Sequence, residues 1–189
     1  MKAKKILTTK DLVLAALFAG LISIGSYLKI STPLVPFSMQ IFFVLLAGQV
    51  LTPAASAVSL FGYISLGIIG LPVFSGGGGI AYALKPSFGY IIGFLFSAVF
   101  ISFFIQKSLK KGPAPLWYRL IINFAGDMIV YVFGIGYYCV LNVLYFHKVL
   151  EFWPVFVSFF LIFMPSDMLF CFLSALAAKR SEAVLKRRD

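Results

Sequence analysis

The sequence predicts an all-α integral membrane protein with six transmembrane helices, and both its composition and its patterning lead to this fold class. Hydrophobic residues make up 61% of the 189 residues and charged residues 12%, whereas soluble domains carry about 45–50% and about 25%. A core of this size cannot hide so much apolar surface, so lipid must cover part of it. We therefore expect one membrane-embedded domain, residues 1–189, in the cell (plasma or inner) membrane.

Six apolar stretches follow one another, and a spanning helix needs roughly 20 residues. The second and third stretches are short. The first also resembles a signal peptide, because lysines precede it, but the five further stretches favour an uncleaved span. The last two exceed the thickness of a bilayer, so they must tilt, kink or protrude. The stretches are residues 12–28, the segment between Pro36 and Pro53, and residues 54–71, 86–106, 118–146 and 152–178.

The basic residues indicate how the helices are oriented. With the N-terminus inside, thirteen of the sixteen Lys and Arg residues fall on the inner side, and only Lys29, Lys85 and Lys148 fall outside. This partition predicts an N-in, C-in topology. It also accounts for the net charge of +10, and no polar stretch interleaves Arg with aromatic residues, so we expect no binding to nucleic acid. The inner residues are Lys2, Lys4, Lys5, Lys10, Lys107, Lys110, Lys111, Arg119, Lys179, Arg180, Lys186, Arg187 and Arg188.

Two acidic residues lie inside predicted spans, Asp127 in the fifth and Asp167 in the sixth. A carboxylate at mid-helix costs about 2.5–3.5 kcal/mol on insertion scales, so it normally faces the bundle interior and serves a function. The alternative is a structural hydrogen bond to a neighbouring helix, with Asn123 or a serine as the candidate partner. Pro165, two residues before Asp167, is expected to bend the sixth helix and open a polar cavity there.

A glycine-rich outer loop is expected between the third and fourth helices, where Gly76, Gly77, Gly78 and Gly79 follow one another. This run is either a flexible connection or a segment whose backbone approaches a ligand and offers N–H groups to an anion. Lys85 adds a cation to the same outer region.

Small residues recur every four positions in the first helix. Ala15 and Ala19 share one face, and Ala16 and Gly20 repeat the spacing one step round. Such a face allows a second helix to approach closely, so it predicts an interface with a partner helix.

The sequence lacks the residues that several other chemistries need. No Gly-x-x-x-x-Gly-Lys-Ser/Thr motif occurs, so the chain has no means of its own to hydrolyse ATP. Cys139 and Cys171 are expected to be buried thiols, and neither they nor His147 belong to a metal motif. We expect no metal, no cofactor and no enzymatic activity. The remaining enzyme hypothesis uses Asp127 and Asp167 as an acid pair.

Three ordered motifs resemble those of the BioY family, the biotin-specific substrate-binding subunits (S components) of energy-coupling factor (ECF) transporters. Residues 33–40 (PLVPFSMQ) with 43–48 (FVLLAG) resemble the entry to the family's second helix. Residues 67–79 (GIIGLPVFSGGGG) and 86–94 (PSFGYIIGF) resemble its next two signatures. The resemblance extends over residues 12–178.

The resemblance implies high-affinity biotin binding and uptake across the cell membrane, with ATP used only by partner ATPase subunits. Biotin would lie on the outer side, beneath the loops after the first and third helices. Asp167 would contact it, because Pro165-Ser166-Asp167 matches the family's Pro-Gly-Asp. Ala15 and Ala19 match the first-helix motif that docks on the transmembrane coupling subunit.

Two positions depart from the family pattern. Phe170 stands where the family usually has a lysine, three residues after the aspartate, and Lys85 stands where it usually has a glycine before Pro86. Lys85 either compensates in part for the missing lysine, by meeting the biotin carboxylate, or is an exposed loop lysine.

Further candidate residues follow from the chemistry of biotin, which combines a ureido ring, an apolar ring and chain, and a carboxylate. Asp167 can accept hydrogen bonds from ureido N–H groups, and Gln40 offers both donors and an acceptor. The residues that can wall the apolar portion or meet the carboxylate are Phe37, Phe74, Tyr90, Gly76, Gly77, Gly78, Gly79 and Lys85. The alternative function is a stand-alone facilitator or secondary transporter for biotin or a related vitamin, which internal inverted repeats would favour; we find none in the sequence.

Overall fold

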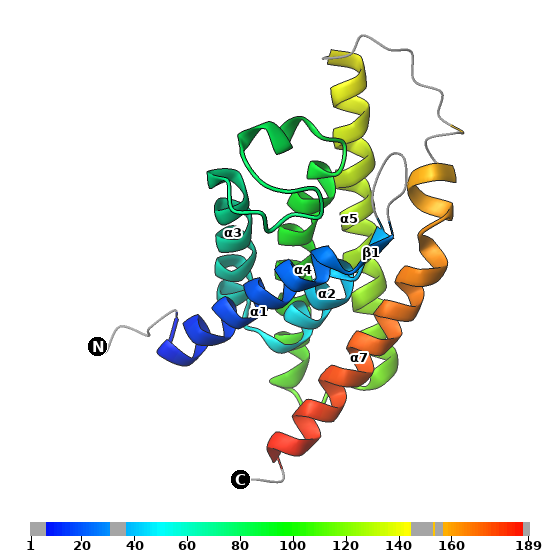
Figure 1. Ribbon diagram of the computed structural model, residues 1–189. Helices are drawn as coiled ribbons and strands as arrows, with labels where there is room; N and C mark the ends of the chain where they lie inside the picture. The colour runs from blue at the N-terminus through cyan, green and yellow to red at the C-terminus, as the bar shows by residue number, and fades with distance from the viewer. Residues whose placement is uncertain (1–6, 31–36, 145–152, 154–156, 187–189) are drawn as a thin grey trace.

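The computed structural model is built from α-helices, which confirms the predicted all-α class. It describes residues 7–30, 37–144, 153 and 157–186. Two-residue strands β1 (Lys29–Ile30) and β2 (Phe37–Ser38) pair antiparallel after the first helix. Within the described ranges the helices are α1 (Thr9–Tyr27), α2 (Gln40–Val50), α3 (Pro53–Ile69), the 3₁₀ helix η1 (Ile80–Leu84), α4 (Phe88–Leu109), α5 (Leu116–Leu144), the π-helical turn η2 (Val157–Leu161) and α7 (Met164–Lys186) (Figure 1).

The helices differ in length. Three of those in the described part of the chain are long and apolar enough to cross a membrane: Thr9–Tyr27, Phe88–Leu109 and Leu116–Val143. The helices α2 and α3 are apolar but have only 11 and 17 residues. At about 1.5 Å per residue, α2 is roughly 16 Å long, about half of the ~30 Å hydrocarbon core.

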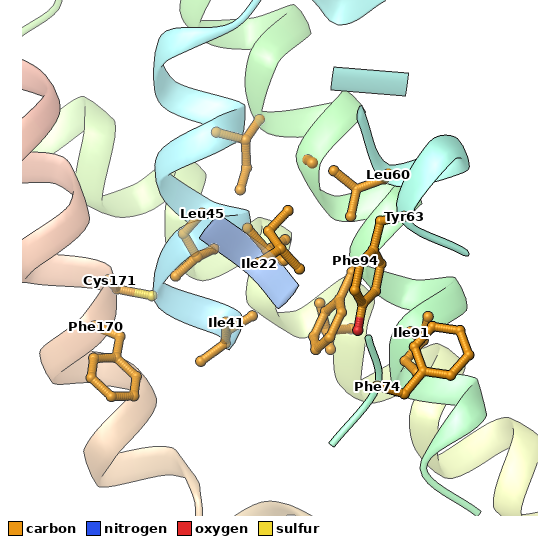
Figure 2. Close-up of a cluster of buried hydrophobic side chains, with 14 of the residues drawn as sticks. Ile22, Ile41, Leu45, Leu60, Tyr63, Phe74, Ile91, Phe94, Phe170 and Cys171 are labelled. Carbon is orange, nitrogen blue, oxygen red and sulfur yellow. The ribbon is translucent and has the colours of Figure 1, made fainter. Parts of the chain in front are cut away.

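The short helix α2 lies in the middle of the bundle. It contacts α1, α4 and α7, so most of its surroundings are protein and not lipid. Figure 2 shows Ile41 and Leu45 of α2 between two groups of core side chains: Phe170 and Cys171 on one side, and Tyr63, Phe74, Ile91 and Phe94 on the other.

The sixth apolar stretch is not one continuous helix, and the bend expected at Pro165 is instead a helix start. The turn η2 ends at Leu161 and α7 begins at Met164. Pro165 therefore lies in the first turn of α7. An amide N–H at this position would have no acceptor within the helix, so proline costs no helical hydrogen bond. Asp167 lies in the same turn, and its amide donates to the carbonyl of Phe163 at 3.0 Å. Asp167 thus lies at the positive N-terminal end of a helix and not at mid-helix.

Glycines bring α4 and α5 into close contact. A Cβ added at Gly93 would lie 2.9 Å from the Cα of Val130, and one added at Gly134 would lie 2.5 Å from the ring of Tyr90. Both distances are shorter than side chains tolerate, so only glycine permits this approach. The Tyr90 ring is therefore held against the backbone of α5.

We expect Gly134→Ala to lower the melting temperature in detergent. The new methyl group would overlap the Tyr90 ring, and such overpacking costs about 1–3 kcal/mol, more than the roughly 1 kcal/mol by which Ala is favoured over Gly in a helix. Gly136→Ala is the matched control, because no atom lies within 4 Å of a Cβ there, and we expect it to cost nothing. Equal melting temperatures for the two variants would show that the approach of Tyr90 to α5 does not depend on glycine.

A buried polar cluster joins α2, α5 and α7 where α2 ends and α5 begins. The side chain of Arg119 is 1% exposed and forms an ion pair with Glu182, and its Nη1 donates to Oε1 of Gln49 at 2.8 Å. Nε2 of Gln49 donates to Oδ1 of Asn123 at 2.7 Å, and Nδ2 of Asn123 donates to Oγ of Ser174 at 2.9 Å. These polar groups satisfy one another, as burial requires.

Candidate functional site

Parts of five segments line a partly open cavity, whose wall is mostly apolar with a few polar groups, as is usual for small-molecule sites. They are β2 with the start of α2, the α3–α4 connection, the first half of α4, the middle of α5 and the start of α7. The α3–α4 connection lies at the top of Figure 1, at the opposite end from the last turns of α7. The lining residues are Ser38, Gln40, Ile41, Ser75, Tyr82, Ser87, Tyr90, Ile91, Phe94, Asp127, Val130, Tyr131, Phe163 and Asp167.

Two carboxylates and a tyrosine form one polar part of this lining. Asp127 and Tyr131 are four residues apart, so they share a face of α5. Asp167 comes from α7, and the Tyr131 hydroxyl donates a hydrogen bond to its Oδ2. Asp127 is 3% exposed and Asp167 is 7% exposed. Two acids far apart in the sequence are thus brought to one cavity, where they can accept hydrogen bonds from N–H groups.

Asn123 is not the structural partner of Asp127. Its amide donates to the carbonyl of Cys171 at 3.0 Å and to Ser174, and its oxygen accepts from Gln49. Among the described residues, none donates a hydrogen bond to Asp127. Asn123 was therefore the wrong candidate, although Asp167 does have a hydrogen bond from a neighbouring helix, donated by Tyr131.

Gln40 is held in place by its neighbours. It is 4% exposed, its Nε2 donates to the Tyr63 hydroxyl, and its Oε1 accepts from the Ser38 hydroxyl at 3.2 Å. The Tyr63 hydroxyl in turn donates to the carbonyl of Val73 at 3.2 Å. An amide has two N–H donors and two acceptor lone pairs, so Gln40 retains capacity for a ligand.

Three buried hydroxyl groups form a second polar part of the lining. Oγ of Ser75 lies 3.2 Å from Oη of Tyr82, and Oγ of Ser87 donates to the same Oη at 3.2 Å. They come from the loop after α3, from η1 and from the residue before α4. Hydroxyl groups can donate to an anionic group of a ligand.

Phe74 lies behind this lining and not in it. It is 1% exposed, and its ring packs on the backbone of Gly67 and against the Tyr82 ring, with centroids 4.7 Å apart. Phe74 therefore positions Tyr82. For Phe37, the backbone is in β2 and the side chain lies outside the described residues.

The glycine run forms a tight turn beside the cavity. Gly77 and Phe74 exchange backbone hydrogen bonds of 3.0 and 3.1 Å, and the Gly79 amide donates to the carbonyl of Gly67 at 2.7 Å. Gly77 and Gly79 have φ of +108° and +99°, which favours glycine. Because these two amides already donate to carbonyls, they are not available to an anion in this conformation. None of Gly76, Gly77, Gly78 and Gly79 is among the cavity-lining residues.

Two lysines lie next to this turn. Nζ of Lys85 donates to the carbonyl of Gly76 at 3.1 Å and lies 4.8 Å from the centroid of the Tyr82 ring. Nζ of Lys29 donates to the carbonyl of Ser75. Both lysines are exposed, so two cations, and not Lys85 alone, are near the hydroxyl groups.

Phe170 belongs to the apolar core (Figure 2). It is 8% exposed, and its ring centroid lies 6.2 Å from that of Phe42. None of the described lining residues is a lysine or an arginine.

The small-residue face of α1 differs from the predicted one. The helix packs on α2 and α3, and this contact leaves Ala15 only 1% exposed and Ala19 partly buried. Ala16 and Gly20 are exposed instead, and nothing lies within 4 Å of a Cβ at Gly20. The exposed small residues are therefore Ala16 and Gly20, on the adjacent face of the helix, and not Ala15 and Ala19.

Several lining residues were not predicted from the sequence. Tyr131 could have been found, because its spacing of four from Asp127 places both on one helix face. The hydroxyls of Ser75, Tyr82 and Ser87 could not, because they lie in an irregular segment whose path depends on tertiary contacts.

Comparison with known proteins agrees with this architecture. Residues 1–187 match the model of the BioY family. The chain belongs to the BioY family. The probable biotin transporter BioY of Lysinibacillus sphaericus is 38% identical over 180 residues, which cover 95% of this chain and 90% of that protein. The biotin transporter BioY of Rhizobium etli is 32% identical over 181 residues, which cover 92% and 93%.

A solved structure has the same fold as this BioY chain. It is the crystal structure of the S-component for biotin from an ECF-type ABC transporter, with a TM-score of 0.79 and 28% identity, covering 94% of this chain and 95% of that one. The resemblance predicted from the sequence motifs is confirmed. BioY is a family of transporters and not of enzymes, so Asp127 and Asp167 are considered below as binding residues.

Proposed function

We propose that this BioY protein is the biotin-binding S component of an ECF transporter in the cell membrane. The cavity carries the proposal: it places Asp167 and Gln40 among apolar side chains, within a fold that is similar to the S-component for biotin. Biotin needs acceptors for its ureido N–H groups, an apolar wall and a donor-rich place for its carboxylate.

The lining offers a partner for each part of biotin. Asp167 accepts from the ureido ring, and Gln40 offers a donor and an acceptor. Tyr90, Ile91 and Phe94 cover the apolar ring and chain. The carboxylate lies toward the hydroxyls of the α3–α4 connection, where Lys85 and Lys29 supply positive charge.

The energy for uptake comes from partner subunits. The chain has no phosphate-binding loop of its own, so ATPase subunits hydrolyse ATP and a transmembrane coupling subunit transmits the motion. In this proposal the whole chain is one membrane-embedded domain with six spans.

Titration of the purified protein with biotin tests the binding function, and we expect saturable binding in the absence of partner subunits. Proteoliposomes that contain this chain alone should accumulate no biotin. Uptake by such liposomes would favour the facilitator, and absence of binding would refute the proposal.

The topology proposed with this function is N-in, C-in. Reporter fusions at residues 30, 80 and 148 should report the outer side, and fusions at residues 110 and 186 the inner side, because of the partition of Lys and Arg. An outer reading at residue 110 would overturn the six-span count.

We expect Gly20→Trp to lower severalfold the amount of coupling subunit that co-purifies with this chain. The exposed face of Ala16 and Gly20 admits a close helix only while its residues are small. The biotin titration should be unchanged, since neither residue lines the cavity. Leu17→Trp is the control, because Leu17 is already large and 55% exposed. Ala15→Trp is a poorer probe, because Ala15 packs inside the protein. If Gly20→Trp co-purified with as much coupling subunit as the wild type does, the face of Ala16 and Gly20 would not belong to the interface.

A further inference from the structure

Asp127 is a buried carboxylate to which the described part of the protein donates no hydrogen bond. It is 3% exposed and lines the cavity. Asp167, which lines the same cavity, accepts a bond from Tyr131, but no described residue does the same for Asp127. The oxygens of Asp127 are not among the described, fully buried atoms that lack a partner, so they face the cavity, where a donor from outside the protein can reach them. The presence of this carboxylate is best explained by donors that arrive with a ligand.

The charges around the cavity restrict what that ligand presents to Asp127. None of the described lining residues is a lysine or arginine, and position 170, where the resemblance expects a lysine, is a phenylalanine in the apolar core. Burial and the nearby Asp167 disfavour a negative charge on Asp127, and they disfavour an anionic ligand group at the same place. Neutral N–H donors placed between them stabilise both.

We propose that Asp127 is a second ligand-binding carboxylate, which accepts one ureido N–H of biotin while Asp167 accepts the other. The inference rests on the proposed biotin-binding function. A ureido ring carries its two N–H groups on opposite sides of its carbonyl, so carboxylates from two different helices can each take one. The acidic pair then binds the ring, and the apolar chain runs along Phe94 and Ile91.

This assignment also orients the ligand. Its carboxylate is repelled by Asp127 and Asp167 and attracted to the donors of Ser75, Tyr82 and Ser87, beside which Lys29 and Lys85 lie. The protein therefore selects ligands that have two N–H donors at one end and an anionic group at the other.

The test uses the full-length protein in detergent, with Asp127→Asn and Asp127→Leu as variants. We expect both variants to bind biotin roughly tenfold to a hundredfold more weakly than the wild type. Their melting temperatures without ligand should be unchanged or higher, because a buried carboxyl group without a donor is removed. The control is Met128→Leu, a change of similar volume at a neighbouring position outside the lining, which should change neither property.

Two biotin analogues, each methylated on one ureido nitrogen, identify the partner of Asp127. Both should bind the wild type more weakly than biotin does. For one of them, Asp127→Leu should cause almost no further loss, because the methyl group has already removed the N–H that Asp127 accepts.

The outcomes separate this inference from the function on which it rests. If the wild type binds biotin and both Asp127 variants bind it equally well, the inference fails and the proposed function stands. Weaker binding with a lower melting temperature in both variants would make Asp127 structural, which also overturns it. If the wild type does not bind biotin, the proposed function fails and the inference fails with it.

Discussion

Asp167→Asn is expected to weaken biotin binding by roughly tenfold to a hundredfold. The substitution keeps the shape of the side chain, removes its charge and turns one acceptor oxygen into a donor. Hydrogen bonds to a charged group contribute about 1.5–3 kcal/mol, which corresponds to this loss. Titration of purified protein measures it, and the melting temperature without ligand checks that the variant is folded.

Tyr131→Phe is a milder change that tests the same role of Asp167. It removes the hydroxyl that donates to Asp167 and keeps the ring, so the Asp167 carboxyl stays in place but is less well oriented. We expect a loss smaller than that of Asp167→Asn. If folded Asp167→Asn bound biotin normally, the bond to Tyr131 would be the main role of Asp167, and that role would be structural.

Glu182→Ala is expected to lower the free energy of unfolding by about 2–3 kcal/mol. It leaves the guanidinium of Arg119, 1% exposed, without its counter-charge. Removing one partner of a fully buried pair costs about 3–5 kcal/mol. Glu182 is 23% exposed, so water screens the pair in part and the cost is lower. Chemical unfolding in mixed micelles measures the change.

Arg180→Ala is the matched control for Glu182→Ala. It removes a charge from the same helix at an exposed position, and we expect a change within about 0.5 kcal/mol. The double variant Arg119→Met/Glu182→Ala should be more stable than the sum of the single changes indicates, because it leaves no unpaired buried charge. Additive losses would show that the pair contributes nothing by itself.

The sequence alone was enough to predict most of the helices and three side chains of the site. The apolar stretches gave the positions of α1 to α5 to within a few residues; α1, for example, begins at Thr9 and not at residue 12, because Thr8 and Asp11 form a capping box. The sixth stretch was less accurate, because α7 begins only at Met164. Asp167 was identifiable because a carboxylate in an apolar stretch is costly without a function. Gln40 and Tyr90 were identifiable from the chemistry of biotin, and the structure places all three in the cavity lining.

Only the tertiary structure decided which helix faces meet. In a soluble protein, the apolar face of a helix indicates the core, but in a membrane both lipid and core are apolar, so periodicity does not distinguish them. For this reason the sequence could not tell that Ala15 is packed inside while Ala16 is exposed, or that α2 is central. The same contacts place Asp127 in the cavity lining, where no described residue donates a hydrogen bond to it. They also bring the hydroxyls of Ser75 and Ser87 into the cavity lining. The sequence determines the helices and the presence of buried charge, and the packing determines what that charge faces.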